Sequence, residues 1–264
     1  MRSLLYVPAD KPHFIAKAHL RGADYVILDL EDAVPEAHKA PARAGLAEAV
    51  RSLRLGQGGV AVRVNPGDEA DIVAALAAGI DLLVYPKADS IAALDRLDAI
   101  LQRLGSDVPV LATIESPAGI MAAAEICRHP RLAAVNVGSE DLALALGGVP
   151  EPDVLRLPKL LVHYAAKAAG KLSLGLLRSI ADFADTDAIA DAAREARRHG
   201  FDGSTCVHPS AVPLLNTAFA PSAAELAWAK AVLATEGTVS LGGQMIDKPL
   251  RQRAAALLRA AGAE

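Results

Sequence analysis

Two carboxylates are the residues of this chain best placed to do chemistry. Glu115 follows an apolar run at residues 110–114, and Asp141 lies just past a second run at residues 133–137. Both runs have the pattern of buried parallel strands, and the two acids project from one sheet edge if those strands are neighbours. Two oxygen ligands suit a hard divalent cation such as Mg²⁺, which commonly keeps waters that a substrate can displace. The pair therefore predicts metal-assisted chemistry on an oxygen-rich small molecule.

A structural role is the alternative for both acids. Each precedes a helical segment, where an acidic N-cap is also favourable. Glu140 stands beside Asp141, and spacing alone does not decide which of these two would face a metal.

Strand-like and helix-like segments alternate along almost the whole chain. Eight strand–helix units in 264 residues predict an α/β fold, a (β/α)₈ TIM barrel. An open doubly wound sheet is the competing fold, but no Gly-x-Gly-x-x-Gly turn follows the first strand. Helices are expected at residues 14–20, 91–104, 120–128 and 188–199, among others. The expected strands are residues 3–7, 25–30, 59–65, 81–85, 109–114, 133–137, 171–176 and 203–207.

The last part of the chain exceeds what barrel closure needs. We expect the barrel to span residues 1–220 and a C-terminal helical extension to span residues 221–264. The extension has a helical pattern at 223–234, a turn-rich stretch at 236–244 and a final helix. Such a tail is expected to cover an active site or pack on a neighbouring subunit, with Gly242-Gly243 as a candidate hinge.

Composition excludes several classes of protein. A net charge of −4 without a basic block argues against a nucleic-acid or anionic-membrane partner. The apolar stretch at residues 4–7 is too short for a signal-peptide core or a membrane span. The two cysteines, Cys127 and Cys206, have the pattern of reduced thiols. A cytoplasmic protein is expected.

Polar residues that could do chemistry gather at the C-terminal ends of the expected strands, whereas the opposite ends carry no such cluster. Barrel enzymes build their active sites at the C-terminal ends, so this asymmetry favours an enzyme. The residues at these ends are Asp10, Asp29, Glu31, Asp32, Arg63, Asn65, Lys87, Glu115, Glu140, Asp141, Arg178 and His208.

Arg63 and the acids near it have two interpretations each. The planar fork of Arg63 suits a substrate carboxylate, and the alternative is a structural ion pair with Glu31 or Glu115. Glu31 is a candidate to bond metal-bound waters. Strand alternation sends Asp32 to the other side, where Lys39 or Arg43 could pair with it.

Lys87 and His208 allow other chemistries that the sequence disfavours. A lysine at a strand end can form a Schiff base, but the two carboxylates favour a rim lysine that pairs with Glu115 or with substrate. His208 has the pattern of a packed loop histidine, and no cluster of His or Cys supports a zinc site.

A set of motifs in order along the chain carries a family resemblance. The chain resembles the citrate lyase beta subunit-like family, CoA-ester lyases of the malyl-CoA and citramalyl-CoA lyase type within the HpcH/HpaI aldolase superfamily. The resemblance implies a Mg²⁺-dependent, usually trimeric barrel that cleaves or forms a carbon–carbon bond beside a CoA-type thioester. The motifs are Arg2-Ser-Leu-Leu-Tyr-Val-Pro, Gly22-Ala-Asp-Tyr-Val-Ile-Leu-Asp-Leu-Glu-Asp-Ala-Val, Val62-Arg-Val-Asn-Pro, Pro86-Lys87, Ile114-Glu-Ser-Pro-Ala-Gly-Ile, Gly138-Ser-Glu-Asp-Leu, Val207-His-Pro-Ser and Gly243-Gln-Met-Ile-Asp-Lys-Pro.

The resemblance also implies roles for individual residues. It makes Glu115 and Asp141 the metal ligands and gives Arg63 the carboxylate of a 2-oxo acid. It brings Asp247 from a neighbouring subunit of a homotrimer as the acid–base residue at the acyl carbon, where the alternative is a plain N-cap of the last helix. The implied partners are a CoA thioester and a 2-oxo acid.

Two segments match the family only loosely, residues 151–159 and 174–183, so the substrate is not named by the sequence. Three alternatives stay open. They are a beta subunit acting on a carrier-protein thioester, a CoA-free metal-dependent aldolase of 2-oxo acids, and a barrel retained as a binding protein.

Overall fold

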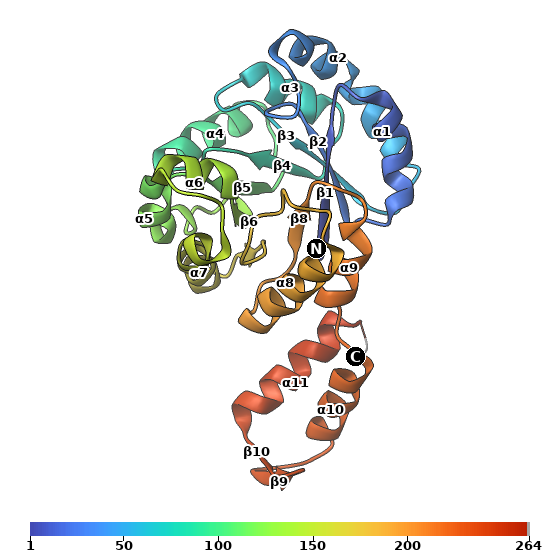
Figure 1. The fold of residues 1–264 in the computed structure, drawn as a ribbon, viewed down its shortest axis with the longest axis vertical. Coiled ribbons are helices and arrows are strands. Elements are labelled where there is room, and N and C mark those ends of the chain that lie inside the picture. Colours follow the sequence, from blue (N-terminus) through green and yellow to red (C-terminus); the bar gives the residue numbers. More distant parts are fainter. Residues whose placement is uncertain (263–264) are drawn as a thin grey trace. The chain divides into compact units, whose positions relative to one another are not determined.

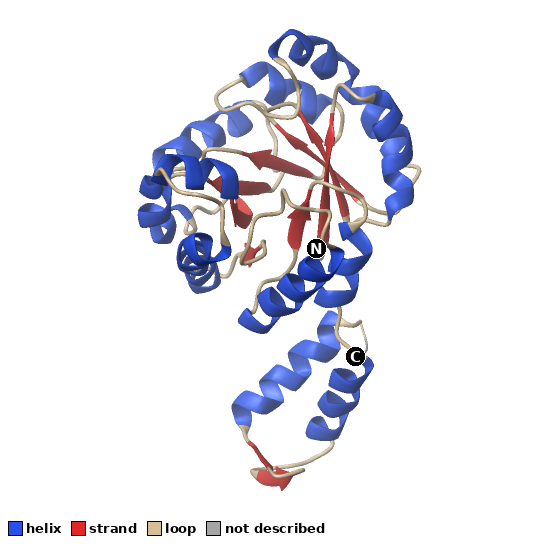
Figure 2. Ribbon diagram, in the orientation of Figure 1, coloured by secondary structure: helices blue, strands red, loops and turns tan. Residues whose placement is uncertain are grey.

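The computed structural model describes residues 1–262 and divides the chain into two compact units, Met1–Asn216 and Thr217–Glu264. The first unit holds eight parallel strands with helices outside them (Figure 1). The second unit holds two helices and two short strands, which Figure 2 colours by type. Each unit is a separate body with its own core.

The eight strands follow each other around a barrel in the order β7-β6-β5-β4-β3-β2-β1-β8. An isolated parallel bridge between Leu174 and Gly203 joins the two ends of this order, and Gly175 N donates to Gly203 O at 2.8 Å. The predicted (β/α)₈ barrel is thereby confirmed. The strands are β1 Ser3–Pro8, β2 Tyr25–Asp29, β3 Gly59–Arg63, β4 Leu82–Tyr85, β5 Val110–Ile114, β6 Leu132–Val137, β7 Leu172–Ser173 and β8 Ser204–Cys206.

Helices follow the strands and cover the outside of the barrel (Figures 1 and 2). Many begin at a side-chain cap, such as Asp185, whose carboxylate accepts from Ala188 N at 2.9 Å. In residues 1–262, no helix combines the length and apolar character needed to cross a membrane. The helices of this unit are α1 Pro12–Ala18, the 3₁₀ helix η1 His19–Arg21, α2 Glu36–Leu53, α3 Glu69–Ala77, α4 Ile91–Arg103, α5 Pro117–Ile126, α6 Ser139–Leu146, α7 Pro152–Ala168, α8 Thr186–His199 and α9 Ala211–Phe219, which contains the boundary between the units.

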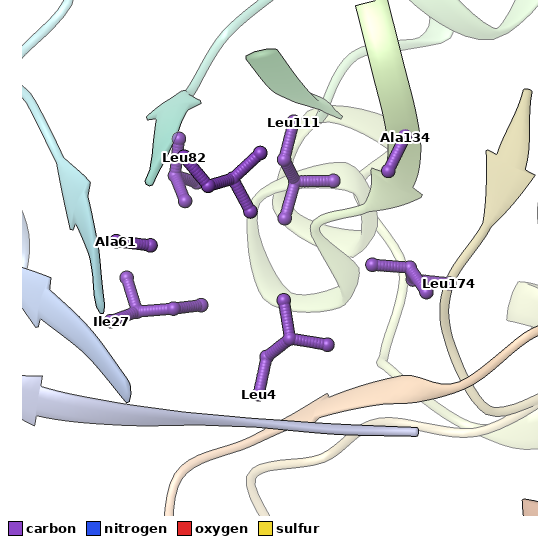
Figure 3. Packing of buried hydrophobic residues seen from close by; sticks show 8 residues of the cluster. Leu4, Ile27, Ala61, Leu82, Leu111, Ala134 and Leu174 are labelled. Carbon is purple, nitrogen blue, oxygen red and sulfur yellow. The ribbon is translucent and has the colours of Figure 1, made fainter. Parts of the chain in front are cut away.

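An apolar layer fills the barrel interior (Figure 3). Because side chains alternate along a strand, the residues two positions further on share the inner face, nearer the C-terminal ends. Those next positions are polar in four strands: Asp29, Arg63, Thr113 and Asn136. A polar layer thus lies directly above the apolar one. The apolar layer consists of Leu4, Ile27, Ala61, Leu82, Val84, Leu111, Ala134 and Leu174.

Several elements begin or end at other residues than predicted, and two of these differences have clear reasons. Strand β7 was expected at residues 171–176, but only Leu172–Ser173 pair regularly, since Leu174 already forms the bridge to Gly203. Helix α5 begins at Pro117 instead of residue 120. There the hydroxyl of Ser116 caps Gly119 N at 3.1 Å and proline occupies the first helical position.

The second unit is a helix–hairpin–helix. Helix α10 (Ala223–Leu233) and helix α11 (Lys248–Ala260) pack around buried Ala229, Val232 and Ala254. Strands β9 (Val239–Leu241) and β10 (Gln244–Ile246) form an antiparallel hairpin whose turn is Gly242-Gly243, with φ of 59° and 81°. A two-residue turn of this kind requires positive φ at both positions. These glycines therefore make a tight turn, and their role as a hinge stays a prediction.

Candidate active site

The polar ends of the strands enclose a cavity of about 390 Å³. Its wall comes from β1, β2, β3, β5, β6 and β8, and from the segments that follow β6 and β7. The charged residues that line it are Asp29, Asp32, Arg63, Glu115, Glu140, Asp141 and Lys159.

Glu115 directly follows β5 and points into the barrel. It shares the inner face with Thr113 and Leu111, which are two and four positions earlier, and is 4% exposed. Its Oε2 atom is buried without a hydrogen-bond partner. The cap of α5 is Ser116, so the alternative of a helix cap was wrong for Glu115.

The surroundings of Glu115 disfavour its negative charge. Burial is the main cause, followed by the nearby charges of Glu31 and Asp141, and together they raise the pKa of Glu115 to about 8. Arg63 and Lys87 act in the opposite direction without balancing this effect. A buried carboxyl crowded by two more acids, with one oxygen unpaired, has the environment that a bound cation would stabilise.

Asp141 lies in the first turn of α6, whose N-cap position is occupied by Gly138. The N-cap alternative was therefore wrong for Asp141 as well. Gly138 also makes room for Glu115, because a Cβ atom at this position would lie 2.6 Å from Cγ of Glu115. Glu140, the other candidate, accepts a hydrogen bond from the hydroxyl of Ser179 at 2.5 Å. One oxygen of Glu140 is thus engaged, and Asp141 lines the cavity beside Glu115.

The donor set fits a hard cation with few protein ligands. Glu115 and Asp141 offer carboxylate oxygens, which Mg²⁺ prefers, and Mg²⁺ commonly completes its shell with water and substrate. Within residues 1–262, no cluster of three or more His, Cys, Asp or Glu side chains is arranged to hold a metal. The geometry accordingly fits an open, two-carboxylate site better than a closed structural one.

Arg63 is held by acids on the inner face of the barrel. Its Nε and Nη2 donate to the two carboxylate oxygens of Asp29 at 2.7 and 2.6 Å. Nη1 lies 2.9 Å from Glu31 and 3.3 Å from Asp32, and the guanidinium lies over the ring of Tyr6. Burial opposes the charge, but the bonds to Asp29 outweigh it and raise the pKa of Arg63. Of the two expected ion-pair partners of Arg63, Glu31 contacts the guanidinium and Glu115 does not. Asp29, which was not expected, makes two direct hydrogen bonds with it.

Lys87 was expected to pair with Glu115 or with substrate, but in the structure it pairs with Glu31. Nζ of Lys87 lies 3.0 Å from Oε1 of Glu31. The backbone of Lys87 has a φ of 52°, the left-handed region that non-glycine residues seldom adopt. Glu31 therefore bridges Lys87 and Arg63, and its charge also acts on Glu115.

Asp32 lines the cavity, and its expected pairing with Lys39 or Arg43 was wrong. Lys39 donates to Asn65 Oδ1 at 2.6 Å, and Arg43 donates to Asp71 at 2.5 Å. The reason is burial: Asp71 is fully buried and requires a cation, whereas Asp32 is exposed.

The two remaining predicted residues lie at other places. Asp247 belongs to the second unit, where its carboxylate caps α11 by accepting from Leu250 N at 3.1 Å. Its catalytic role stays a prediction. His208 stacks on Phe183 with ring centroids 4.5 Å apart and bonds Ser210, so the interpretation as a packed loop histidine is confirmed.

Lys159 is the cavity residue that sequence reasoning missed. It lies in α7, is 4% exposed, and its Nζ donates to the carbonyl oxygens of Leu176 and Arg178 at 2.9 and 2.7 Å. Burial lowers the pKa of Lys159 to about 7, although the charge of Glu140 acts against this. A signal was present: Lys159 occupies the apolar stripe of its helix, with Leu155 and Val162 on the same buried face.

Known proteins resemble this chain over almost its whole length. A sequence model of the HpcH/HpaI aldolase/citrate lyase family matches residues 2–209. A citrate lyase subunit beta-like protein of Mycobacterium tuberculosis is 36% identical over 273 residues, covering 98% of this chain and 94% of that protein. A (3S)-malyl-CoA thioesterase of Cereibacter sphaeroides is 34% identical over 250 residues, covering 92% of this chain and 85% of that protein.

A solved structure extends the likeness to both fold and ligands. CitE of Mycobacterium tuberculosis, in complex with magnesium, acetoacetate and coenzyme A, matches with a TM-score of 0.80 and 34% identity. The match covers 99% of this chain and 100% of that one. Magnesium, the metal expected from the sequence, is the metal in that complex. The predicted resemblance is confirmed, and this chain belongs to the HpcH/HpaI aldolase/citrate lyase family.

Proposed function

We propose that this protein is a Mg²⁺-dependent carbon–carbon lyase that cleaves or forms a 3-hydroxyacyl-CoA-type thioester. The products of cleavage are a 2-oxo acid and an acyl thioester. The observation that carries the proposal is Glu115, a buried carboxyl with an unpartnered oxygen beside Asp141 at the C-terminal end of the barrel. Magnesium and coenzyme A in the complex of the related CitE support the same metal and substrate class.

Glu115 and Asp141 would hold the metal, which when bound supplies Lewis-acid stabilisation of a developing oxyanion. Arg63 would orient the carboxylate of the 2-oxo acid. Asp29 fixes two donors of Arg63, and Nη1 faces the more exposed Asp32, so a substrate carboxylate would replace the Asp32 contact. Glu31 pairs with both Arg63 and Lys87 and so helps to hold Arg63 in this orientation.

The bond that breaks joins the hydroxyl-bearing carbon to the carbon next to the thioester carbonyl. Water in the open cavity would take the hydroxyl proton, and the electrons left on that oxygen would form the new carbonyl of the 2-oxo acid. The electron pair of the broken carbon–carbon bond would leave with the other fragment as a thioester enolate. Asp247 of the partner subunit would then protonate the enolate carbon. The family resemblance of the segment from Gly243 to Pro249 supports this role and a homotrimer. The free, buried thiols of Cys127 and Cys206 support a cytoplasmic location.

The test is to incubate the purified chain with acetyl-CoA or propionyl-CoA and with glyoxylate, pyruvate or oxaloacetate. Products are identified by mass spectrometry with Mg²⁺ and with excess chelator. A new 3-hydroxyacyl-CoA that forms only with Mg²⁺ is the expected result. Absence of any product, beside an active lyase as positive control, would overturn the proposal and favour a carrier-protein thioester or a CoA-free aldolase reaction.

Thioester hydrolysis is a second candidate, favoured by one comparison. The relative from Cereibacter sphaeroides is named a (3S)-malyl-CoA thioesterase. The same assay run on (3S)-malyl-CoA separates the two reactions, because hydrolysis releases malate and free CoA, whereas cleavage releases glyoxylate and acetyl-CoA.

A further inference from the structure

Lys159 is a cation in the cavity wall that contacts no carboxylate in the described part of the chain, although the charge of Glu140 acts on it. Two of the N–H bonds of its ammonium are used by the carbonyl oxygens of Leu176 and Arg178. Within the described part of the chain, Lys159 makes no salt bridge. A buried ammonium normally has a paired anion, because burial of an isolated charge is costly.

The other cation in the cavity wall is in the opposite situation. Arg63 contacts three carboxylates, those of Asp29, Glu31 and Asp32. Its positive charge is therefore balanced within the protein. Lys159 is left as the lining cation whose charge has no carboxylate in contact, and its burial lowers its pKa.

Backbone groups of one segment hold the ammonium of Lys159 in place. Its two carbonyl acceptors lie in the segment after β7, which also lines the cavity with Gly175 and Leu176. Ser179 of this segment bonds Glu140, the neighbour of the predicted metal ligand Asp141. The ammonium is thus held in the wall of the same cavity that Glu115 and Asp141 line.

We infer that Lys159 is a specificity-determining residue that binds a second carboxylate of the substrate. This rests on the proposed function, in which one carboxylate of the 2-oxo acid takes the metal and Arg63. The inference names the substrate class more closely: a 2-oxo acid that carries a further carboxylate, in preference to a monocarboxylic one. The ligand carboxylate would supply the counter-charge that the protein withholds from Lys159.

The experiment compares two stable acids that differ by one carboxylate, malate and lactate. Their binding to the full chain with Mg²⁺ is measured by calorimetry. Wild type should bind malate more tightly than lactate by about tenfold to a hundredfold, the range of one charge-assisted hydrogen bond. Lys159→Met should remove this preference while leaving lactate affinity within about twofold, the margin expected when no lactate contact is lost. Lys159→Arg should retain part of it.

Lys167→Met is the matched control, since Lys167 lies on the same helix but pairs with Asp202 at the surface. It should bind both acids like wild type. If Lys159→Met does not fold, Lys159→Gln, which keeps amide donors for the two carbonyls, gives the same comparison. Wild type without a preference for malate, or a Lys159 variant that weakens both acids equally, would overturn the inference.

The binding readout is independent of turnover. A preference for malate that depends on Lys159 in a chain without lyase activity would support the inference while the proposed function fails. Lyase activity together with equal affinity for malate and lactate would support the proposed function and overturn the inference about Lys159.

Discussion

Asp29 and Arg63 are register partners on the neighbouring strands β2 and β3, and their side chains close a two-bond ion pair inside the barrel. Asp29 is 1% exposed. Because adjacent residues in register project to the same side of a sheet, the strand pairing itself sets this contact. The orientation of Arg63 toward the cavity is therefore a consequence of sheet register.

Asp29→Asn should destabilise the fold by about 3 kcal/mol, because it leaves a buried guanidinium with an incomplete set of acids. Urea denaturation measures this change. Glu195→Gln breaks the exposed pair of Arg156 and Glu195 and is the control, expected to cost less than about 1 kcal/mol. Equal costs for the two variants would contradict a dominant role of the inner pair.

Glu115 should make the metal-free protein less stable as pH rises. Its pKa is about 8 in the folded chain against an ordinary value of 4.5, so the folded state binds more protons between these values. Stability then falls with rising pH across that window, and Glu115→Gln should flatten this part of the profile. Thermal unfolding in chelator from pH 5 to pH 9 measures it, and an unchanged slope in the variant would show that Glu115 does not titrate in this range.

The same carboxyl should make Mg²⁺ binding depend on pH in the opposite sense. The metal requires the ionised carboxylate, so its affinity should rise about tenfold per pH unit below pH 8 and level off above it. Calorimetric titration of wild type with Mg²⁺ at pH 6, 7 and 8.5 tests this. Affinity that does not vary with pH would exclude Glu115 as a ligand.

Gly138→Ala should weaken Mg²⁺ binding by about tenfold to a hundredfold, as changes beside metal ligands commonly do. The added Cβ would lie 2.6 Å from Cγ of Glu115 and must displace that side chain. Gly45→Ala is the matched control, because Gly45 lies in α2 with nothing within 4 Å of the new atom. The control should keep its metal affinity and gain about 1 kcal/mol of helix stability. Equal metal affinity in both variants would contradict the close approach.

The barrel and the polar strand ends could be predicted because apolar strand segments are visible locally in the sequence. Active sites of barrel enzymes lie at the C-terminal ends of such strands, so the residues that follow each strand could be named as well. Glu115 could be found in this way, since it directly follows a mostly apolar strand. The partners of Arg63 and Lys87 could not, because they depend on register and on which acids are most buried. Lys159 could not be found from the strand ends, because it lies within helix α7; its signal is a lysine on the buried stripe of that helix.

Asp247 combines a visible structural role with a predicted catalytic one, and two substitutions separate them. Asparagine caps a helix as well as aspartate does, so Asp247→Asn should keep the thermal stability of the chain. Loss of its acid–base function should lower turnover by about a hundredfold or more with Mg²⁺ affinity unchanged. Asp247→Ala should lose the same activity and also about 1 kcal/mol of stability, because the bond to Leu250 N is gone. Unchanged kinetics in the asparagine variant would leave Asp247 a plain helix cap.

The predicted sharing of Asp247 between subunits has its own consequence. Glu115→Gln and Asp247→Asn should each be inactive alone. Co-expressed in one assembly, they should recover part of the wild-type rate, since some sites would take Glu115 from one chain and Asp247 from its neighbour. The measurement is lyase activity of the mixed oligomer, purified through two different tags so that every particle contains both chains. If Asp247 instead acted on the cavity of its own chain, every site in the mixture would lack one of the two groups, and no activity would return.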